Sequence, residues 1–517
     1  MSSRNGAPRL GPLVTFGLMT GPFLSMLDSN IVNVAVPSIA KDFGTSLTVV
    51  QWTLSGYLLA QAGALALSPF LAKRFGTKPV YMASVAAFTT ASVLCATSKS
   101  IEFLIAARVL QGLAGAPLVP LAMSMMMGPS GASRQMSPAA AILLFMAPAA
   151  GPTVGGLLIP AFGWQSIFLI NVPFGIAGIL GARQLDKRLA HPRQEGARLD
   201  WTGLSLLSVG LVFTLYGVSE GPRVGWSSAQ SWPFWAIGAV AVVAYVAWAL
   251  RKPHPAVDLK LVMKPQPALA VTLSVMTSAV LFAALFLVPV FMQTLQGATP
   301  LEAGLALLPQ GLVLGVATIA GNAIAQRVST RLVVFVGMVL LTAMTAGLLL
   351  LDLHTPSWQT ALILSGRGMA MGLVITPLVF NTLSRVPAEE SADANTLFNV
   401  MQRLGGSFGI ALLATFLQAR EQSHIASVLA PLGISHASLG SSSAAAANIP
   451  PGLRQALGDA AVAGFHDTFL VLTVISALGA LLALLIRDSG RTTSDRETAQ
   501  RRPAILLGRG RSPSSVR

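Results

Sequence analysis

The sequence predicts an all-α polytopic membrane protein with fourteen transmembrane helices. Only 10% of its 517 residues are charged and 53% are hydrophobic, whereas a soluble domain carries about 25% charged residues. Apolar stretches long enough to cross a bilayer, for which about 20 residues suffice, recur along almost the whole chain. The first stretch is too long for a signal peptide and lacks a small-residue cleavage site, so we expect it to remain as a span.

The apolar stretches give the order of the predicted helices. Their even number places both termini on the same side of the membrane. The stretches cover residues 11–36, 48–71, 79–98, 102–127, 136–160, 165–184, 199–219, 232–250, 267–293, 300–325, 331–352, 356–384, 394–418 and 462–487.

The lysines and arginines predict which side that is. Of the 34 Lys and Arg residues, 26 lie in the tails and loops on the side of the termini, 5 lie in the opposite loops and 3 lie inside spans. The positive-inside rule therefore places both termini in the cytoplasm. The net charge of +15 is spread over these loops, so it does not form the one-sided patch of a nucleic-acid-binding protein. We expect a multi-pass protein of the plasma (inner) membrane of a bacterium.

Two short basic turns suggest an internal repeat. Residues 72–78 join spans 2 and 3, residues 325–331 join spans 10 and 11, and both read Ala-x-Arg-x-x-Thr-Lys/Arg. Repeated halves are typical of secondary transporters, whose site lies at the repeat interface near the bilayer midplane. The predicted organisation is an N-terminal cytoplasmic tail (1–10), a six-helix bundle (11–185), a linker with two inserted helices (186–266), a second six-helix bundle (267–487) and a basic cytoplasmic tail (488–517). Residues 419–461 are expected to form an extracytoplasmic loop, within which the segment around 448–460 forms a short interfacial helix.

Asp28 is the residue that most needs an explanation, because its span is otherwise almost free of charge. A carboxyl group in a membrane helix costs about 2.5–3.5 kcal/mol and usually marks an ion or proton path. The alternative is a position near the outer interface, where the carboxylate reaches water. Asn30 and Asn33 continue a polar stripe beside Asp28, which favours the path.

Arg108, inside the fourth span, is the second intramembrane charge. A buried guanidinium needs a carboxylate or carbonyl partner, so Arg108 either stabilises ionised Asp28 in one conformation or makes a fixed structural bond to the backbone. Gln111 adds a polar group one turn later, and Gly112 permits close packing. Arg367 and Arg403 are the corresponding cations of the later spans.

The fifth span combines a proline with small residues. Pro152 removes a helical hydrogen bond and favours a kink, and Gly151, Gly155 and Gly156 allow another helix to approach closely. Such a helix either seals the pathway against proton leak or serves ordinary packing.

Several other chemistries are excluded or disfavoured. No lysine follows a glycine, so the phosphate-binding loop of an ATP-driven pump is absent and the energy source is expected to be the proton gradient, with no cofactor. Cys95 is the single cysteine, which excludes a disulfide or a cysteine-based metal site, and the six histidines fall in predicted loops or at span ends. Gly405–Gly409 matches a hydrolase motif, but on a predicted membrane helix with no embedded histidine, so we expect no enzyme.

Six segments in chain order resemble one known family, the fourteen-span drug:H⁺ antiporter branch of the major facilitator superfamily. They are Leu27–Pro37, Gln51–Ala60, Arg108 with Gln111 and Gly112, Gly151–Pro152 with Gly155–Gly156, Trp164–Gly175 and Asn395–Gly409. The resemblance implies the major facilitator fold, with two six-helix bundles plus two inserted helices. It also implies alternating access, efflux coupled to proton entry, protonation of Asp28 from outside, and a role for Arg108 in proton transfer or in tuning Asp28.

The turn between spans 2 and 3 departs from that family's pattern. Arg74, Gly76 and Lys78 remain as gating residues, but Lys73 stands where the family usually carries an aspartate. Loss of that carboxylate removes a charge partner expected to lock the cytoplasmic side.

The predicted function is proton-coupled export of amphipathic small molecules by a monomer in the lipid bilayer. Neutral, zwitterionic or monocationic compounds are the expected substrates. The alternatives are dedicated export of one metabolite or antibiotic, or a transport-inactive sensor or scaffold with the same fold. The candidate substrate-pathway residues are polar or apolar side chains at predicted span positions: Asn30, Asn33, Gln51, Trp52, Tyr57, Gln111, Met146, Phe282 and Phe286.

Overall fold

The computed structural model describes residues 12–127, 138–184, 200–225, 228–252, 255, 259–383, 391–432 and 450–487. Each of the fourteen predicted stretches coincides with helix in this part of the chain. Eleven of the described helices are long and apolar enough to cross a membrane, and two shorter apolar helices cover Ala150–Phe162 and Trp201–Gly217. The all-α membrane architecture is therefore confirmed.

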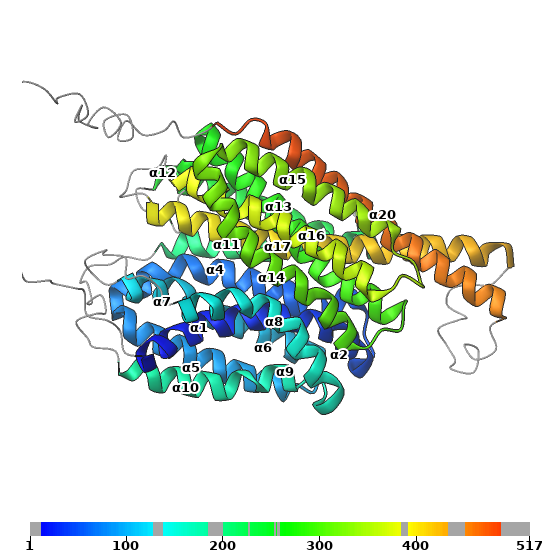
Figure 1. The fold of residues 1–517 in the computed structure, drawn as a ribbon, viewed down its shortest axis with the longest axis horizontal. Coiled ribbons are helices and arrows are strands. Elements are labelled where there is room, and N and C mark those ends of the chain that lie inside the picture. The colour runs from blue at the N-terminus through cyan, green and yellow to red at the C-terminus, as the bar shows by residue number, and fades with distance from the viewer. Residues whose placement is uncertain are drawn as a thin grey trace, which may run out of the picture.

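The N-terminal helices, residues 12–184, lie together on one side of the molecule (Figure 1). Helices α1, α4, α5, α6, α8 and α10 pack against one another there. Their bounds are α1 Pro12–Ile31, η1 Val32–Ala35, α2 Val36–Phe43, α3 Leu47–Val50, α4 Trp52–Phe75, α5 Thr77–Ala96, α6 Ile101–Gly115, α7 Leu118–Met127, α8 Pro138–Phe162, α9 Ser166–Leu169 and α10 Asn171–Arg183.

The C-terminal helices, residues 259–487, form the other side, and α11 lies at the seam, in contact with both α4 and α17. The bounds are α11 Trp201–Val224, α12 Trp232–Arg251, η3 Leu259–Met263, α13 Pro265–Thr294, α14 Pro300–Arg327, α15 Thr330–Ala346, η4 Gly347–Leu350, α16 Ser357–Leu383, α17 Ser391–Leu429, η6 Ala430–Leu432 and α20 Pro451–Ala483.

The two basic turns of the sequence repeat are both tight, by different local chemistry. Gly76 ends α4 with φ of 91°, a left-handed conformation that glycine adopts without a steric penalty. Ser329 instead precedes α15 as an N-cap, its side chain accepting a hydrogen bond from the Leu332 N–H. Both devices reverse the chain within a few residues and place consecutive helices side by side.

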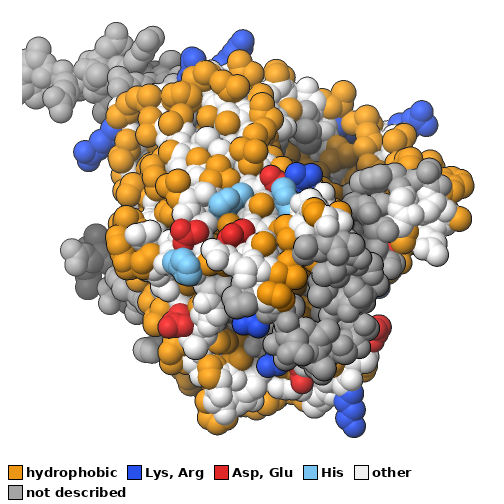
Figure 2. All heavy atoms as spheres, turned by 90° about the vertical axis from the view of Figure 1, so that its right-hand side faces the viewer, with side chains coloured by type: hydrophobic (Ala, Val, Ile, Leu, Met, Phe, Trp, Pro, Cys, Tyr) orange, Lys and Arg blue, Asp and Glu red, His pale blue; other side chains and the backbone are white. Residues whose placement is uncertain are grey.

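The loop predicted from residue 419 is wrong for residues 419–429, which are helical, whereas the helix predicted around 448–460 is found from Pro451 onward. Helix α17 continues to Leu429 and α20 already begins at Pro451, and the two helices project together beyond the bundle (Figure 1). His424 consequently lies on a helix rather than in a loop, and His466 lies on α20, at the end of its predicted span. The polar composition of this segment suggested a loop, but its polar side chains pair between the two helices. Asp467 Oδ2 of α20 lies 2.7 Å from both Arg420 Nε and His424 Nε2 of α17. Acidic and histidine side chains are visible at this end in Figure 2.

Hydrogen bonds between the N-terminal and C-terminal helices gather toward the far end of the bundle, which is the end opposite Pro12 and Ala483 (Figure 1). Segments at this end, including η1 and the start of α14, carry most of them. In the described part of the chain these bonds join Val34 to Gln293, Thr48 to Gln418, Ser55 to Ser407 and Thr153 to Gly304. Side-chain hydrogen bonds therefore join the two sets of helices at the far end.

Candidate functional site

Asp28 lies in the interior of the N-terminal helices, and none of its side chain is exposed. Its Oδ2 atom lies 2.5 Å from Arg108 Nη1. Its Oδ1 atom accepts hydrogen bonds from Gln111 Nε2 at 3.0 Å and from Asn171 Nδ2 at 2.9 Å. Asp28 thus does not reach the surface, which removes the interfacial alternative considered from the sequence.

Arg108 makes both kinds of bond that the sequence left open. Besides Asp28, Nη1 donates to Gln111 Oε1 at 2.6 Å, and Nε donates to the Thr53 carbonyl oxygen at 2.9 Å. The Tyr57 ring lies 4.1 Å from the guanidinium carbon, close enough for a cation–π contact. The planar guanidinium donates in several directions at once, as a lysine ammonium would not. It therefore ties α1, α4 and α6 together.

A layer of neutral polar side chains surrounds the ion pair. Ser92 Oγ accepts from Gln111 Nε2 at 2.7 Å and from Asn171 Nδ2 at 3.1 Å. The Oδ1 atom of Asn171 is buried without a hydrogen-bond partner among the described residues. We did not single out Ser92 or Asn171 as site residues from the sequence. A useful signal was Asn171 itself, a lone amide well inside an apolar stretch, since buried amides usually need partners.

Tyr57 connects the ion pair to a second polar group one turn along α1. Its hydroxyl donates to the Ser25 carbonyl oxygen at 3.4 Å and accepts from Gln61 Nε2 at 3.1 Å. Gln61 also donates to Ser25 Oγ at 3.0 Å. Polar groups therefore line a continuous strip from Asp28 to Gln61 between α1 and α4.

Glycines set the helix spacing around this site. A Cβ on Gly112 would overlap the Tyr57 carbonyl oxygen, so α6 and α4 touch through backbone. A Cβ on Gly151 would lie 3.0 Å from the Leu27 carbonyl oxygen, and one on Gly155 would lie 2.9 Å from Ile31 Cγ1, which brings α8 against the helix that carries Asp28.

The same span also contacts the C-terminal helices. A Cβ on Gly156 would lie 2.6 Å from the Pro300 carbonyl oxygen, and a Cβ on Gly304 would overlap the carbonyl oxygen of Pro152. Helix α8 therefore lies between α1 and α14, and its small residues make both approaches possible.

The structure does not bring the remaining sequence candidates to the ion pair. Asn30 and Asn33 donate to carbonyl oxygens of their own segment, Met26 and Asn30, at 2.7 and 3.0 Å. Gln51 is fully buried and accepts from Ser55 Oγ at 2.6 Å.

The apolar and gating candidates lie elsewhere. Phe286 is fully buried in α13, Phe282 packs against Gly406, and the side chain of Met146 lies outside the described residues. Trp52 faces an aromatic pocket that is described below. Arg74, Gly76 and Lys78 lie at the turn between α4 and α5, where Lys78 Nζ donates to the Arg183 carbonyl oxygen at 2.8 Å.

Arg367 is the buried cation of the C-terminal helices, and its surroundings differ from those of Arg108. Its Nη1 atom donates to Thr345 Oγ1, its Nη2 atom donates to the Val280 carbonyl oxygen at 3.0 Å, and its Nε atom has no partner among the described residues. No described carboxylate lies within ion-pair distance of it. Arg403, on α17, is half-buried.

Comparison with known proteins agrees with this architecture. The profile described as Major Facilitator Superfamily matches residues 18–410. The multidrug resistance protein B homolog of Mycobacterium tuberculosis is 33% identical over 79% of this chain and 76% of its own length. The multidrug export protein EmrB of Escherichia coli is 30% identical over 80% and 81%, and the methylenomycin A resistance protein of Streptomyces coelicolor is 30% identical over 78% and 85%.

Solved structures share the fold at low sequence identity. A bacterial homolog of the human lysosomal transporter Spinster, in an inward-facing and occupied conformation, superposes with a TM-score of 0.61 at 15% identity, over 93% of this chain and 97% of that one. A D-xylose–proton symporter gives 0.58 at 11% identity, over 91% and 96%. This chain belongs to the Major Facilitator Superfamily of membrane transporters.

Proposed function

We propose that this transporter exports amphipathic small molecules in exchange for protons, and that Asp28 carries the proton. The observation behind the proposal is a carboxylate with no exposed surface whose one charged partner within hydrogen-bond distance, among the described residues, is Arg108. A proton moving through 100 mV releases about 2.3 kcal/mol, so an embedded carboxyl group is a suitable coupling element.

The geometry supports a two-state cycle. With Asp28 ionised, Arg108 holds it together with Gln111 and Asn171, and the N-terminal helices are locked by these bonds. Protonation removes the charge that Arg108 pairs with, so the bond weakens and the helices around α1 are freed to shift. Removing one partner of a buried ion pair typically costs about 3–5 kcal/mol, which is large enough to drive a conformational equilibrium.

The proposed conformational change is a rocking of two six-helix bundles, residues 11–185 and 267–487, about a site between them. The bonds at the far end support this division, because they join one bundle to the other across residues distant in sequence. With both termini in the cytoplasm of a bacterial cell, as the loop charges favour, the far end faces outside, and its bonds must break for the bundles to open outward.

The relatives support drug-like substrates, because the M. tuberculosis and E. coli proteins are named for multidrug resistance and export. Dedicated export of one compound is the second candidate, favoured by the relative that is named for resistance to a single antibiotic, methylenomycin A. Competition between chemically unrelated dyes separates the two. In a multidrug transporter each dye inhibits export of the others, whereas unrelated dyes do not inhibit export by a dedicated transporter.

The test of proton coupling uses purified protein in proteoliposomes with an imposed pH gradient. We expect dye accumulation that collapses when the gradient is dissipated, together with proton movement that starts on dye addition. Full accumulation without a gradient would contradict the proposal.

A further inference from the structure

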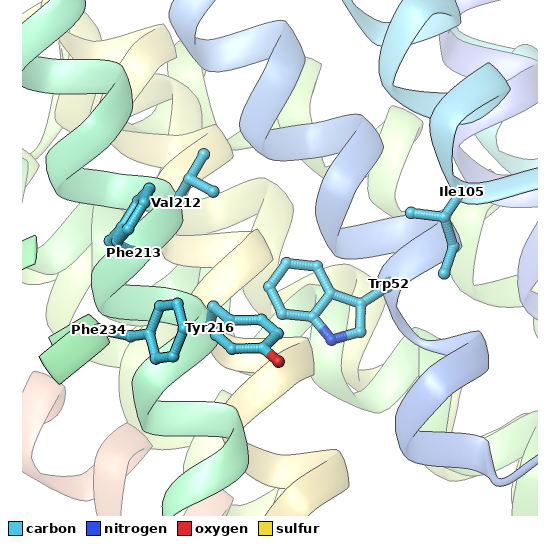
Figure 3. A pocket seen from close by; sticks show the side chains of 6 residues that line it. All are labelled: Trp52, Ile105, Val212, Phe213, Tyr216 and Phe234. Atoms are coloured by element: carbon cyan, nitrogen blue, oxygen red, sulfur yellow. The ribbon is translucent and has the colours of Figure 1, made fainter. Parts of the chain in front are cut away.

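A pocket of about 370 Å³ lies between the inserted helices and the N-terminal helices, apart from the ion pair. Trp52 of α4 and Ile105 of α6 form one wall. Figure 3 shows them facing Val212, Phe213 and Tyr216 of α11 and Phe234 of α12. Pockets of 300–1,000 Å³ are the usual size of small-molecule sites, so this one has room for a compact molecule of two or three rings.

The lining is apolar and unusually rich in rings. Four of the six lining side chains are aromatic, whereas aromatic residues make up 7% of the chain. Tyr216 meets Phe234 edge to face at 4.9 Å between ring centroids, and Trp52 at 6.3 Å. An aromatic ligand gains about 0.5–1.5 kcal/mol from each ring contact beyond the area it buries, and an acyl chain lacks this contribution. The wall therefore favours flat aromatic molecules over lipid tails.

The pocket is open rather than sealed in the protein. Val212 is 44% exposed and Tyr216 is 40% exposed, and both lie on the apolar part of α11, Trp201–Gly217. Helix α11 also contacts α17 as well as α4, so the pocket lies beside the seam between the N-terminal and C-terminal helices. A molecule dissolved in the bilayer can reach it without crossing water.

The wall of the pocket is directly connected to the ion pair. Trp52 is followed by Thr53, whose carbonyl oxygen accepts from Arg108 Nε at 2.9 Å. Ile105 lies one helical turn before Arg108 on α6. A ligand that shifts the backbone of α4 at Trp52 or of α6 at Ile105 also displaces the Thr53 carbonyl oxygen or the helix that carries Arg108.

We propose that this pocket is a binding site for uncharged, flat aromatic molecules and that its occupancy is coupled to the Asp28–Arg108 pair. The identification of such molecules as exported substrates rests on the proposed function. The binding site itself does not, because it is tested without a proton gradient.

The binding test uses N-phenyl-1-naphthylamine, an uncharged aromatic probe, in a radiolabelled form with purified full-length protein in detergent. We expect Tyr216→Ala and Phe234→Ala each to weaken binding about tenfold, the sum of lost ring contacts and lost apolar area. Val212→Trp fills the pocket, starting from an exposed residue that places little demand on folding, and should abolish binding. Trp201→Ala, an exposed aromatic on the same helix outside the pocket, is the matched control and should bind as the wild type does.

Two competitors of equal carbon number identify the ligand class. Naphthalene should displace the probe, and 1-decanol at equal aqueous activity should not. Equal displacement by both would show a site for lipid tails and would overturn the proposal, as would unchanged binding in Val212→Trp.

Coupling is tested through thermodynamic reciprocity. If occupancy affects the ion pair, Asp28→Asn must change the dissociation constant of the probe severalfold, and an unchanged constant would refute the coupling. Vesicles that fail to export a probe which still binds would contradict the proposed transport of that probe and leave the pocket standing.

Discussion

Arg108 and Arg367, the two arginines buried within the described part of the chain, have different partners. Arg108 of the N-terminal helices meets a carboxylate, an amide oxygen and a backbone carbonyl oxygen. Arg367 lies in the fourth long helix of the C-terminal set and meets a hydroxyl and a backbone carbonyl oxygen. Val280, whose carbonyl it contacts, lies at about the depth in α13 that Asp28 has in α1.

The partner of Arg108 can change its charge, whereas the partners of Arg367 cannot. A backbone carbonyl cannot change its charge, so the Arg367 contacts stay the same at any stage of a proton-driven cycle. The Asp28–Arg108 contact depends on protonation. We therefore propose that proton coupling resides in the N-terminal helices and that the Arg367 contacts of the C-terminal helices serve as a scaffold.

The largest effect is expected from Asp28→Asn. The amide keeps the shape of the side chain but cannot bind and release a proton, so gradient-driven dye accumulation in proteoliposomes should fall to background while the protein still folds. Asp352→Asn, in an exposed loop of the C-terminal helices, is the control and should transport normally. Dye accumulation at the wild-type level in Asp28→Asn would contradict the proposal that proton coupling resides in the N-terminal helices.

The next effect concerns stability. Arg108→Met strands the Asp28 carboxylate, which should lower the free energy of unfolding by about 3–5 kcal/mol. Arg367→Met strands only neutral groups, which costs about 1–3 kcal/mol. Thermal unfolding of the two variants in the same detergent measures the difference.

A double variant supplies the control for that measurement. Asp28→Asn combined with Arg108→Met leaves no buried charge at the site and should recover most of the stability without recovering transport. If Arg108→Met and Arg367→Met lowered the unfolding free energy equally, the Asp28–Arg108 contact would stabilise the fold no more than the neutral contacts of Arg367 do.

Much of this asymmetry could be predicted from the sequence. Asp28 and Arg108 were predicted because charges are rare in apolar stretches and each has a large, known cost. Asn171 and Ser92 were missed because neutral polar residues in membrane helices are common, and only the fold shows that Asn171 donates to the Asp28 carboxylate and that Ser92 accepts from Asn171 and Gln111. The aromatic pocket was out of reach, because its residues come from four helices whose packing no local pattern encodes. The extension of α17 to Leu429 was not predicted, because its polar side chains pair with α20, a neighbour that the local sequence does not show.

Helix packing is the property that the two sets of helices share. A Cβ on Gly112 would overlap the Tyr57 carbonyl oxygen, and one on Gly372 would lie 2.6 Å from the backbone nitrogen of Thr318. Gly112→Ala and Gly372→Ala should therefore each lower the unfolding free energy by about 1–3 kcal/mol, the usual cost of overpacking. Gly56→Ala is the control, because its Cβ would make an ordinary contact of 3.5 Å. A neutral Gly372→Ala would show that the packing, too, is asymmetric.

The smallest effect is expected at the loop before α16. Asp352 accepts from Thr355 Oγ1 and from the His354 N–H, both at 2.8 Å, and these bonds lower the pKa of its carboxyl group. Because the pKa is lowered, ionised Asp352 stabilises the folded loop at pH values above its unfolded pKa of about 3.9. This stabilisation is lost as the pH falls through the folded pKa. In the loop before α6, the side chain that accepts a backbone N–H is the hydroxyl of the N-cap residue Ser100, which does not titrate over this range.

Amide hydrogen exchange measures this difference between the two loops. After correction for intrinsic rates, protection of the His354 amide should decrease on acidification, and protection of the Phe103 amide, which Ser100 accepts, should not. Thr355→Val should weaken the pH response at His354. Parallel pH profiles for the two amides would contradict the assignment.

The most direct test of proton coupling is the exchange of protons when a transported dye is added to purified, detergent-solubilised protein in weakly buffered solution. We predict a pH change proportional to the amount of wild-type protein, retained in Arg367→Met and absent in Asp28→Asn. An undiminished pH change in Asp28→Asn would contradict the central claim that this buried carboxyl group binds and releases the coupled proton.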